Sequence, residues 1–182
     1  MPIQRQVYKS SKTKKSLVSV IVSGCKSPIL PVKFCNLVKP FYYPNSPTIA
    51  RYSIATKFCP KENSEFLKTI QTIEQNENVA SIIKNDSIKE NGEYLNTGKL
   101  IIKFQTKNKI PVFVINKEGE KPVPLDLADE FSPNTMVQVV FDVLRYTKKN
   151  IDPPEYGISF KPTKVFYYPQ ISKEKEVKHG NS

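Results

Sequence analysis

Short runs of β-branched and aromatic residues recur along this chain of 182 residues, and several of the intervals between them are too short for helical crossovers. Because a parallel connection between neighbouring strands needs a dozen or more residues, strands this close together pair mainly antiparallel. The longest run, residues 135–147, could also form a helix, but its β-branched content favours a strand. The pattern predicts a mainly β fold whose strands lie near residues 17–22, 48–58, 99–105, 111–115, 135–147 and 157–168.

Alternation within the run at 48–58 predicts a strand with two different faces. One face is apolar, and the other carries two cations, Arg51 and Lys57. The run at 99–105 carries a second polar row, which consists of Lys99, Lys103 and Gln105. Two adjacent strands with rows of this kind would form a positively charged groove.

One helix interrupts the predicted strands. Its apolar residues Phe66, Ile70 and Ile73 follow the spacing i, i+4 and i+7, and its start is marked by the capping residues Asn63 and Ser64. The remaining segments have weaker patterns. We expect an extended, irregular path through the proline-rich residues 26–47 and a polar loop at 86–97, and a second short helix is compatible with residues 79–84.

Together these elements predict a single OB-type antiparallel β-barrel with an inserted helical segment, and a β-sandwich is the alternative. The predicted domain covers residues 17–169. Residues 1–16 are polar and basic with little to bury, which is typical of a flexible arm. Residues 170–182 form a polar tail.

Positive charge is concentrated in the first third of the chain. The net charge is +11, and eleven Lys or Arg residues precede the first acidic residue, Glu62, whereas the charges from Glu62 onward are balanced. A cationic patch attracts polyanions through counterion release, and nucleic acid is the commonest such partner. A solvated basic surface and an anionic membrane are alternatives, but this segment contains no basic amphipathic helix of the kind that binds membranes.

Residues able to support catalysis or to hold a metal ion are sparse. The only histidine, His179, lies in the polar tail, the glycines are isolated, and three scattered cysteines do not make a zinc site. The acidic cluster of Asp126, Asp129 and Glu130 is more typical of a solvated face. We therefore predict no enzymatic activity and no cofactor. No apolar run approaches the ~20 residues of a membrane span, so we expect a cytoplasmic protein without a membrane anchor.

Aromatic residues lie beside several of the cations. Cations bind phosphates and flat rings stack on unpaired bases, so this combination is typical of proteins that bind single-stranded nucleic acid. Tyrosines are the rings best suited to exposure, because the hydroxyl group tolerates water. The predicted nucleic-acid-binding residues are Lys39, Tyr42, Tyr43, Arg51, Lys57, Lys99, Lys103, Arg145, Tyr146, Lys161, Lys164 and Tyr167.

Two stretches of the chain resemble known proteins. The segment 52–61, followed at once by the predicted helix, resembles an early strand–helix step in phage single-stranded DNA-binding proteins. The order of the later segments is similar to that in the core of single-stranded DNA-binding proteins from large cytoplasmic DNA viruses and virus-like linear plasmids. These segments are 98–104, 111–115, 144–146 and the closing 156–160 with 165–166. The resemblance implies an OB-fold protein that coats and protects unwound DNA during replication. Many such proteins end in an acidic tail, whereas residues 172–179 are mixed and slightly basic.

These observations predict a sequence-independent single-stranded DNA-binding protein. The first alternative is a structural or packaging protein that binds duplex nucleic acid through the arm at 1–16. The second is an enzyme or enzyme subunit that uses the acidic cluster at 126–130. Single-stranded DNA is the expected partner and a membrane is not. The sequence leaves open whether RNA or replication proteins also bind, and it leaves the oligomeric state open.

Overall fold

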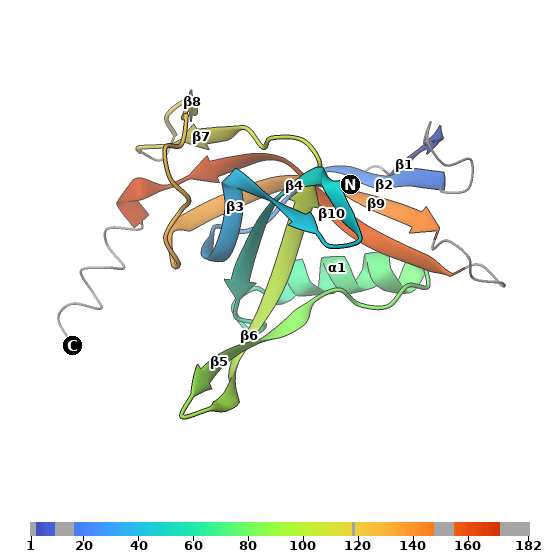
Figure 1. Cartoon of the computed structure of the whole chain (residues 1–182), viewed down its shortest axis with the longest axis horizontal. Coiled ribbons are helices and arrows are strands. Elements are labelled where there is room, and N and C mark those ends of the chain that lie inside the picture. The colour runs from blue at the N-terminus through green and yellow to red at the C-terminus, as the bar shows by residue number, and fades with distance from the viewer. Residues whose placement is uncertain (1–2, 10–16, 118, 148–154, 172–182) are drawn as a thin grey trace.

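A computed structural model describes residues 3–9, 17–117, 119–147 and 155–171 of the chain (Figure 1). These residues form ten strands and one helix, α1 (Ser64–Asn76). The predicted mainly β fold is confirmed. The strands are β1 (Ile3–Lys9), β2 (Leu17–Lys26), β3 (Leu30–Tyr43), β4 (Ser46–Phe58), β5 (Lys84–Glu90), β6 (Glu93–Thr106), β7 (Val112–Val114), β8 (Val123–Pro124), β9 (Met136–Thr147) and β10 (Tyr156–Tyr167).

All ten strands belong to one sheet. Hydrogen-bonded neighbours follow the order β5-β6-β4-β3-β9-β10-β7-β8, and β2 pairs with both β1 and β9. Every ladder is antiparallel except the one between β7 and β10. Among the described residues no ladder joins the two ends of this order, so the predicted OB-type barrel is not confirmed.

The strand β9 supplies the centre of the core. Four apolar residues that alternate along this strand share one face and are at most 1% exposed; they are Val137, Val139, Phe141 and Val143. The ring of Phe141 contacts Phe66 of α1, Phe104 of β6 and Phe160 of β10, with centroid distances of 6.5, 4.8 and 5.5 Å. These ring contacts join the helix to strands from distant parts of the sequence.

The helix α1 confirms the predicted helical segment. Its buried face carries Ile70, which is 1% exposed, and Phe66, whose ring centroid lies 5.5 Å from that of Phe58 in β4. The side chain of Asn63, the residue before the helix, makes no capping hydrogen bond, so packing rather than capping holds this end. In the part of the chain that the structure describes, no helix is long and apolar enough to span a membrane.

The short helix that the sequence allowed at 79–84 is not formed. The chain leaves α1 at Asn78, whose φ of 54° is left-handed. Glu74 of the helix then accepts hydrogen bonds from the backbone N–H of Ile82, at 3.0 Å, and from the hydroxyl of Ser81, at 3.2 Å. Because Glu74 takes the N–H of Ile82, the segment follows an irregular path along the helix until β5 begins.

The proline-rich segment that we expected to be irregular contains the whole of β3. Its pairing with β4 shifts register three times between Val32 and Tyr43, and the longest interruption spans Asn36 to Phe41. Pro40 lies inside that interruption, where its missing N–H removes no ladder bond. The bulges therefore allow a strand to contain prolines that, in the sequence, indicate irregular structure.

The predicted polar loop at 86–97 is instead a hairpin made by β5 and the first half of β6. Asn91 and Gly92 connect the strands with φ values of 50° and 81°. Two successive positive φ values are the signature of a type I′ turn, which the dipeptide Asn-Gly favours. The polar composition of the segment concealed this turn signal, and β6 begins at Glu93 rather than at Lys99.

The predicted flexible arm differs from the structure over residues 3–9. These residues form β1, which pairs antiparallel with β2 from Ile3 opposite Val22 to Lys9 opposite Leu17. Since β2 uses its other edge for β9, β1 extends the sheet outward. The rest of the predicted arm, residues 1–2 and 10–16, and residues 172–182 of the tail lie outside the described residues.

Candidate nucleic-acid interface

The ladders of β3, β4 and β6 place cations and rings on one outer face of the sheet. Residues that pair directly across strands share a face. On the outer face, two rows cross the three strands: Phe34–Ala55–Lys103 and Asn36–Ser53–Gln105. Phe41 pairs with Arg51 further along the same face. The opposite face packs into the core, where Ile54 and Phe104 are fully buried.

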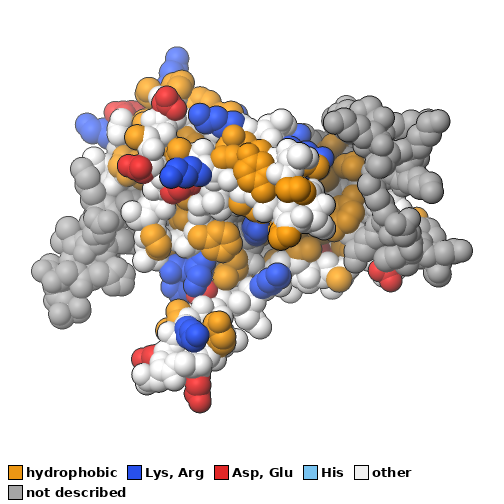
Figure 2. All heavy atoms as spheres, viewed as in Figure 1, with side chains coloured by type: hydrophobic (Ala, Val, Ile, Leu, Met, Phe, Trp, Pro, Cys, Tyr) orange, Lys and Arg blue, Asp and Glu red, His pale blue; other side chains and the backbone are white. Residues whose placement is uncertain are grey.

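We call this outer surface the cationic–aromatic face. Lys57 belongs to it because it pairs with Ile101, which alternates with Lys103 along β6, and Lys99 follows by the same alternation. None of the positions that the ladders assign to this face is acidic. Figure 2 shows hydrophobic and Lys or Arg side chains intermixed on the visible side of the body. The face consists of Phe34, Phe41, Tyr43, Arg51, Lys57, Lys99, Lys103 and Gln105.

Cations and rings on the cationic–aromatic face are already paired with each other. The Nζ atom of Lys103 lies 4.8 Å from the ring centroid of Phe41 and 5.9 Å from that of Phe34. The guanidinium of Arg51 lies 5.1 Å from the centroid of Tyr43, which meets Phe41 edge-on at 5.1 Å. Phe34 remains 45% exposed. The contacts hold the cations in place and leave ring surface open to a ligand.

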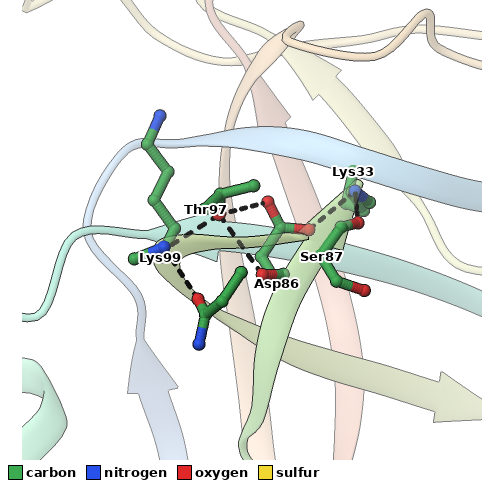
Figure 3. A network of polar contacts seen from close by, with 7 residues as sticks. Lys33, Asp86, Ser87, Thr97 and Lys99 are labelled. Carbon is green, nitrogen blue, oxygen red and sulfur yellow. Dashed lines mark hydrogen bonds and ion pairs between the residues drawn. The ribbon is translucent and has the colours of Figure 1, made fainter. Parts of the chain in front are cut away.

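A buried aspartate anchors one end of this face (Figure 3). The carboxylate of Asp86 lies 2.6 Å from the Nζ atom of Lys33 and accepts a 2.8 Å hydrogen bond from the hydroxyl of Thr97. Burial alone raises the pKa of this carboxyl, but the hydrogen bonds from Lys33 and Thr97 and the charges of Lys33 and Lys57 outweigh burial and lower its pKa below the usual range. Asp86 therefore stays charged and ties β3 to the β5–β6 hairpin.

We expect Asp86→Asn to lower the free energy of unfolding by about 1–3 kcal/mol at pH 7, because it leaves Lys33 without its buried partner. A carboxyl whose pKa is lowered by folding stabilises the protein above its unfolded pKa of about 3.9 and loses this effect as the pH falls through the folded pKa. Urea unfolding at pH 7 and pH 3 measures the free energy of unfolding of the variant and of the wild type, and the difference between the two proteins should be smaller at pH 3. An equal difference at both pH values would contradict the lowered pKa of Asp86.

The ladders assign four predicted binding residues to no position on the cationic–aromatic face. Lys39 and Tyr42 are exposed near the β3–β4 turn, and Tyr42 is 53% exposed. Arg145, near the end of β9, forms an ion pair with Glu77 at 3.1 Å, and its guanidinium lies 3.9 Å from the ring centroid of Tyr156. Next to it, the ring of Tyr146 covers the backbone of β10, where a Cβ atom added at Gly157 would lie 2.5 Å from the ring.

Three more predicted residues lie on β10. Lys161 stands opposite Asp142 of β9. Lys164 is exposed, with its Nζ atom 5.8 Å from the ring centroid of Phe166. Tyr167 packs against Phe131 with a centroid distance of 4.9 Å. The predicted residues that the structure brings together are therefore those of the cationic–aromatic face: Tyr43, Arg51, Lys57, Lys99 and Lys103.

Sequence reasoning did not select Phe34, Phe41 or Lys33. Phe34 and Phe41 contribute the rings nearest to Lys103, and Lys33 holds Asp86. All three lie in β3, which the prolines led us to expect as irregular. Lys33 and Phe34 lie within the run 32–35, whose apolar residues could have indicated the strand.

The acidic cluster is used for structure. Glu130 accepts hydrogen bonds from the backbone N–H groups of Leu37, at 2.8 Å, and Val38, both in β3. Asp126 makes only an exposed ion pair with Lys109 at 3.9 Å. Within the described ranges, no group of three or more His, Cys, Asp or Glu side chains could hold a metal ion. Glu130 therefore fastens the loop before β9 to β3.

We expect Glu130→Gln to destabilise the protein by about 1–3 kcal/mol. A neutral amide has one acceptor oxygen for two N–H groups, and hydrogen bonds to a charged acceptor are the stronger ones. Urea unfolding with circular dichroism measures the change. The matched control is Asp129→Asn, at an exposed neighbour, which should change stability by less than about 0.5 kcal/mol. Equal effects of the two substitutions would argue against the anchoring role.

The three cysteines are thiols and do not form disulfides with one another. Burial, together with the nearby charge of Asp142, raises the pKa of Cys25 to about 11, and burial with the charge of Glu130 does the same for Cys35. Thiols with such a pKa stay protonated at neutral pH, which makes them poor nucleophiles and poor metal ligands.

Comparisons with known proteins identify a shared fold. No family model matches the sequence, and no curated protein matches it. Among solved structures, the single-stranded DNA-binding protein from bacteriophage Enc34 in complex with ssDNA is 16% identical over 89% of this chain and 94% of that chain, with a TM-score of 0.55. A C-terminal truncation of the Enc34 protein is 16% identical over 90% of this chain and 95% of that one, with a TM-score of 0.52. The resemblance found in the sequence is therefore confirmed as a common fold with a phage single-stranded DNA-binding protein.

Proposed function

We propose that the protein binds single-stranded DNA without reading its sequence, and that it coats and protects unwound DNA during replication. The observation that carries this proposal is the cationic–aromatic face. Cations bind phosphates and exposed rings stack on bases, and both contacts are available from every nucleotide. Groups that recognise particular base edges would be hydrogen-bonding side chains, and the amide oxygen of Gln105 already accepts a bond from Tyr43 at 3.3 Å.

The shared fold supports the same function. The Enc34 protein with a similar fold is solved in complex with ssDNA, and the similarity covers nearly the whole of both chains. We propose that the sheet is a partly open OB-type barrel, since OB folds are often incompletely closed. We propose further that the protein acts in the cytoplasm as a non-enzymatic binding protein without a cofactor. RNA and replication proteins are candidate additional partners.

Fluorescence anisotropy tests this function directly. The purified full chain is titrated against single-stranded DNA, single-stranded RNA and duplex DNA of equal length, each at two salt concentrations. We expect the tightest binding to single-stranded DNA of any base composition, with log K falling by roughly 0.7 per neutralised phosphate for each tenfold rise in salt. Equal or stronger binding to the duplex would favour the packaging alternative, and deletion of residues 1–16 would then locate that activity. No binding to any nucleic acid would refute both functions.

A further inference from the structure

The β5–β6 hairpin extends beyond the body of the protein, as Figure 1 shows, and its two faces differ in chemistry. From Ser87 to Glu90 the strands pair without a register shift. Because side chains alternate between faces, one face carries a cation, a ring and two uncharged polar groups: Lys89, Tyr94, Ser87 and Asn96. The other face carries two apolar residues and both acidic residues of the tip: Ile88, Leu95, Glu90 and Glu93.

The pair of Lys89 and Tyr94 repeats the contact found on the cationic–aromatic face. The Nζ atom of Lys89 lies 5.8 Å from the ring centroid of Tyr94, which compares with 4.8 Å between Lys103 and Phe41. Tyr94 is 74% exposed, more than any other large hydrophobic residue in the described part of the chain. A ring so exposed, on a ribbon with no core behind it, contributes little to folding and is available to stack on a ligand.

The root of the hairpin is firmly attached beside the cations of the body. Asp86, the anchor described above, holds Lys33 of β3, and Lys33 also donates to the carbonyl of Ser87 at 3.4 Å. Figure 2 shows hydrophobic and Lys or Arg side chains on the visible face of the hairpin, Asp or Glu side chains at its side and tip, and further Lys or Arg side chains on the body near its root. Lys or Arg side chains therefore lie on both sides of the junction between the body and the hairpin.

We infer that single-stranded DNA continues from the cationic–aromatic face onto the hairpin, where Tyr94 stacks on a base and Lys89 binds a phosphate. This inference rests on the proposed function. Glu90 and Glu93 lie on the opposite face, where they repel phosphates and so confine the strand to the face of Tyr94. The hairpin thus lengthens the binding site beyond the three strands of the body.

A tryptophan reporter tests which face of the hairpin contacts the DNA. The chain contains no tryptophan, so Tyr94→Trp introduces a single one. We expect its fluorescence to be quenched when a single-stranded oligonucleotide of about 30 nucleotides, longer than the site of one OB fold, is added to the full chain. The matched control is Ile88→Trp, at a position that is 48% exposed on the opposite face, and its fluorescence should not be quenched. Equal quenching at both positions, or none at Tyr94 while anisotropy reports binding, would overturn the inference.

Affinity provides a second test. We expect Tyr94→Ala with Lys89→Ala to weaken binding of the long oligonucleotide by about five- to 150-fold, the effect of losing one stacked base. Binding of an oligonucleotide of about six nucleotides, which the body alone can hold, should be unchanged. Unchanged affinity for the long oligonucleotide would overturn the inference and leave the proposed function intact. If the wild type binds no single-stranded DNA, the proposed function fails as well, so the two failures are distinguishable.

Discussion

Arg51→Glu with Lys103→Glu should weaken binding to single-stranded DNA by at least about 100-fold. Each substitution removes a cation from the centre of the cationic–aromatic face and places a carboxylate where a phosphate would lie. Like charges forced together cost several kcal/mol, and 100-fold corresponds to about 2.7 kcal/mol. Fluorescence anisotropy at low salt measures the loss.

The control must change the net charge by the same amount elsewhere. Lys68 on α1 and Lys121 before β8 are both exposed, and neither lies on the three strands of the face. We expect Lys68→Glu with Lys121→Glu to weaken binding only slightly. Glutamine at positions 51 and 103 gives a milder variant that should reduce the salt dependence of log K by roughly 0.7 for each lost phosphate contact. Similar losses in the two Glu pairs would mean that net charge alone drives binding, which would refute the proposed face.

The strand faces show how far local pattern could predict the site. Arg51 and Lys57 alternate along β4, and Lys99 and Lys103 alternate along β6, so the sequence alone placed each pair on one face. The structure pairs β4 with β6 and so joins these two rows. The sequence pattern does not show that the two strands are neighbours. The rings that complete the site required β3, because Phe34 reaches Lys103 through register. Register depends on long-range pairing, which one sequence does not encode locally.

Arg145 illustrates the opposite outcome. Its neighbour Tyr146 and the lysines that follow predicted a binding role, because a cation beside a ring suits a single strand. In the structure its guanidinium is paired with Glu77, and the carboxylate of Glu77 is only 6% exposed. That partner lies 68 residues away in sequence, at the end of α1. The sequence does not show this distant acid, so the pattern of a cation beside a ring does not reveal that Arg145 is already paired.

The β5–β6 hairpin contains a local turn signal, but the polar composition around it favoured the prediction of a loop. The dipeptide Asn91–Gly92 favours a two-residue turn, yet the segment around it is polar and has few β-branched residues. The pairing of Asp86 with Lys33 supplies stability that the sequence pattern does not show. Tertiary contacts thus stabilised a hairpin that its own composition would not predict.

Phe34→Ala with Phe41→Ala should weaken binding to single-stranded DNA by a different mechanism from loss of charge. Each stacked ring contributes on the order of 1–3 kcal/mol, so each lost ring lowers affinity by about five- to 150-fold. Because no cation is removed, the salt dependence of log K should stay at the wild-type value, whereas the glutamine variants reduce it. Anisotropy titrations at several salt concentrations separate the contribution of ring stacking from that of the phosphate contacts.

Phe34 is the better position for a decisive control, because it is 45% exposed and its truncation leaves the core intact. Phe34→Trp keeps a flat ring and should retain wild-type affinity, whereas Phe34→Leu keeps apolar volume without a ring and should lose affinity nearly as Phe34→Ala does. If leucine restored binding, the face would act through apolar contact rather than stacking. If neither alanine substitution changed the affinity, the bases would lie elsewhere, and the cations of this face would bind the phosphate backbone alone.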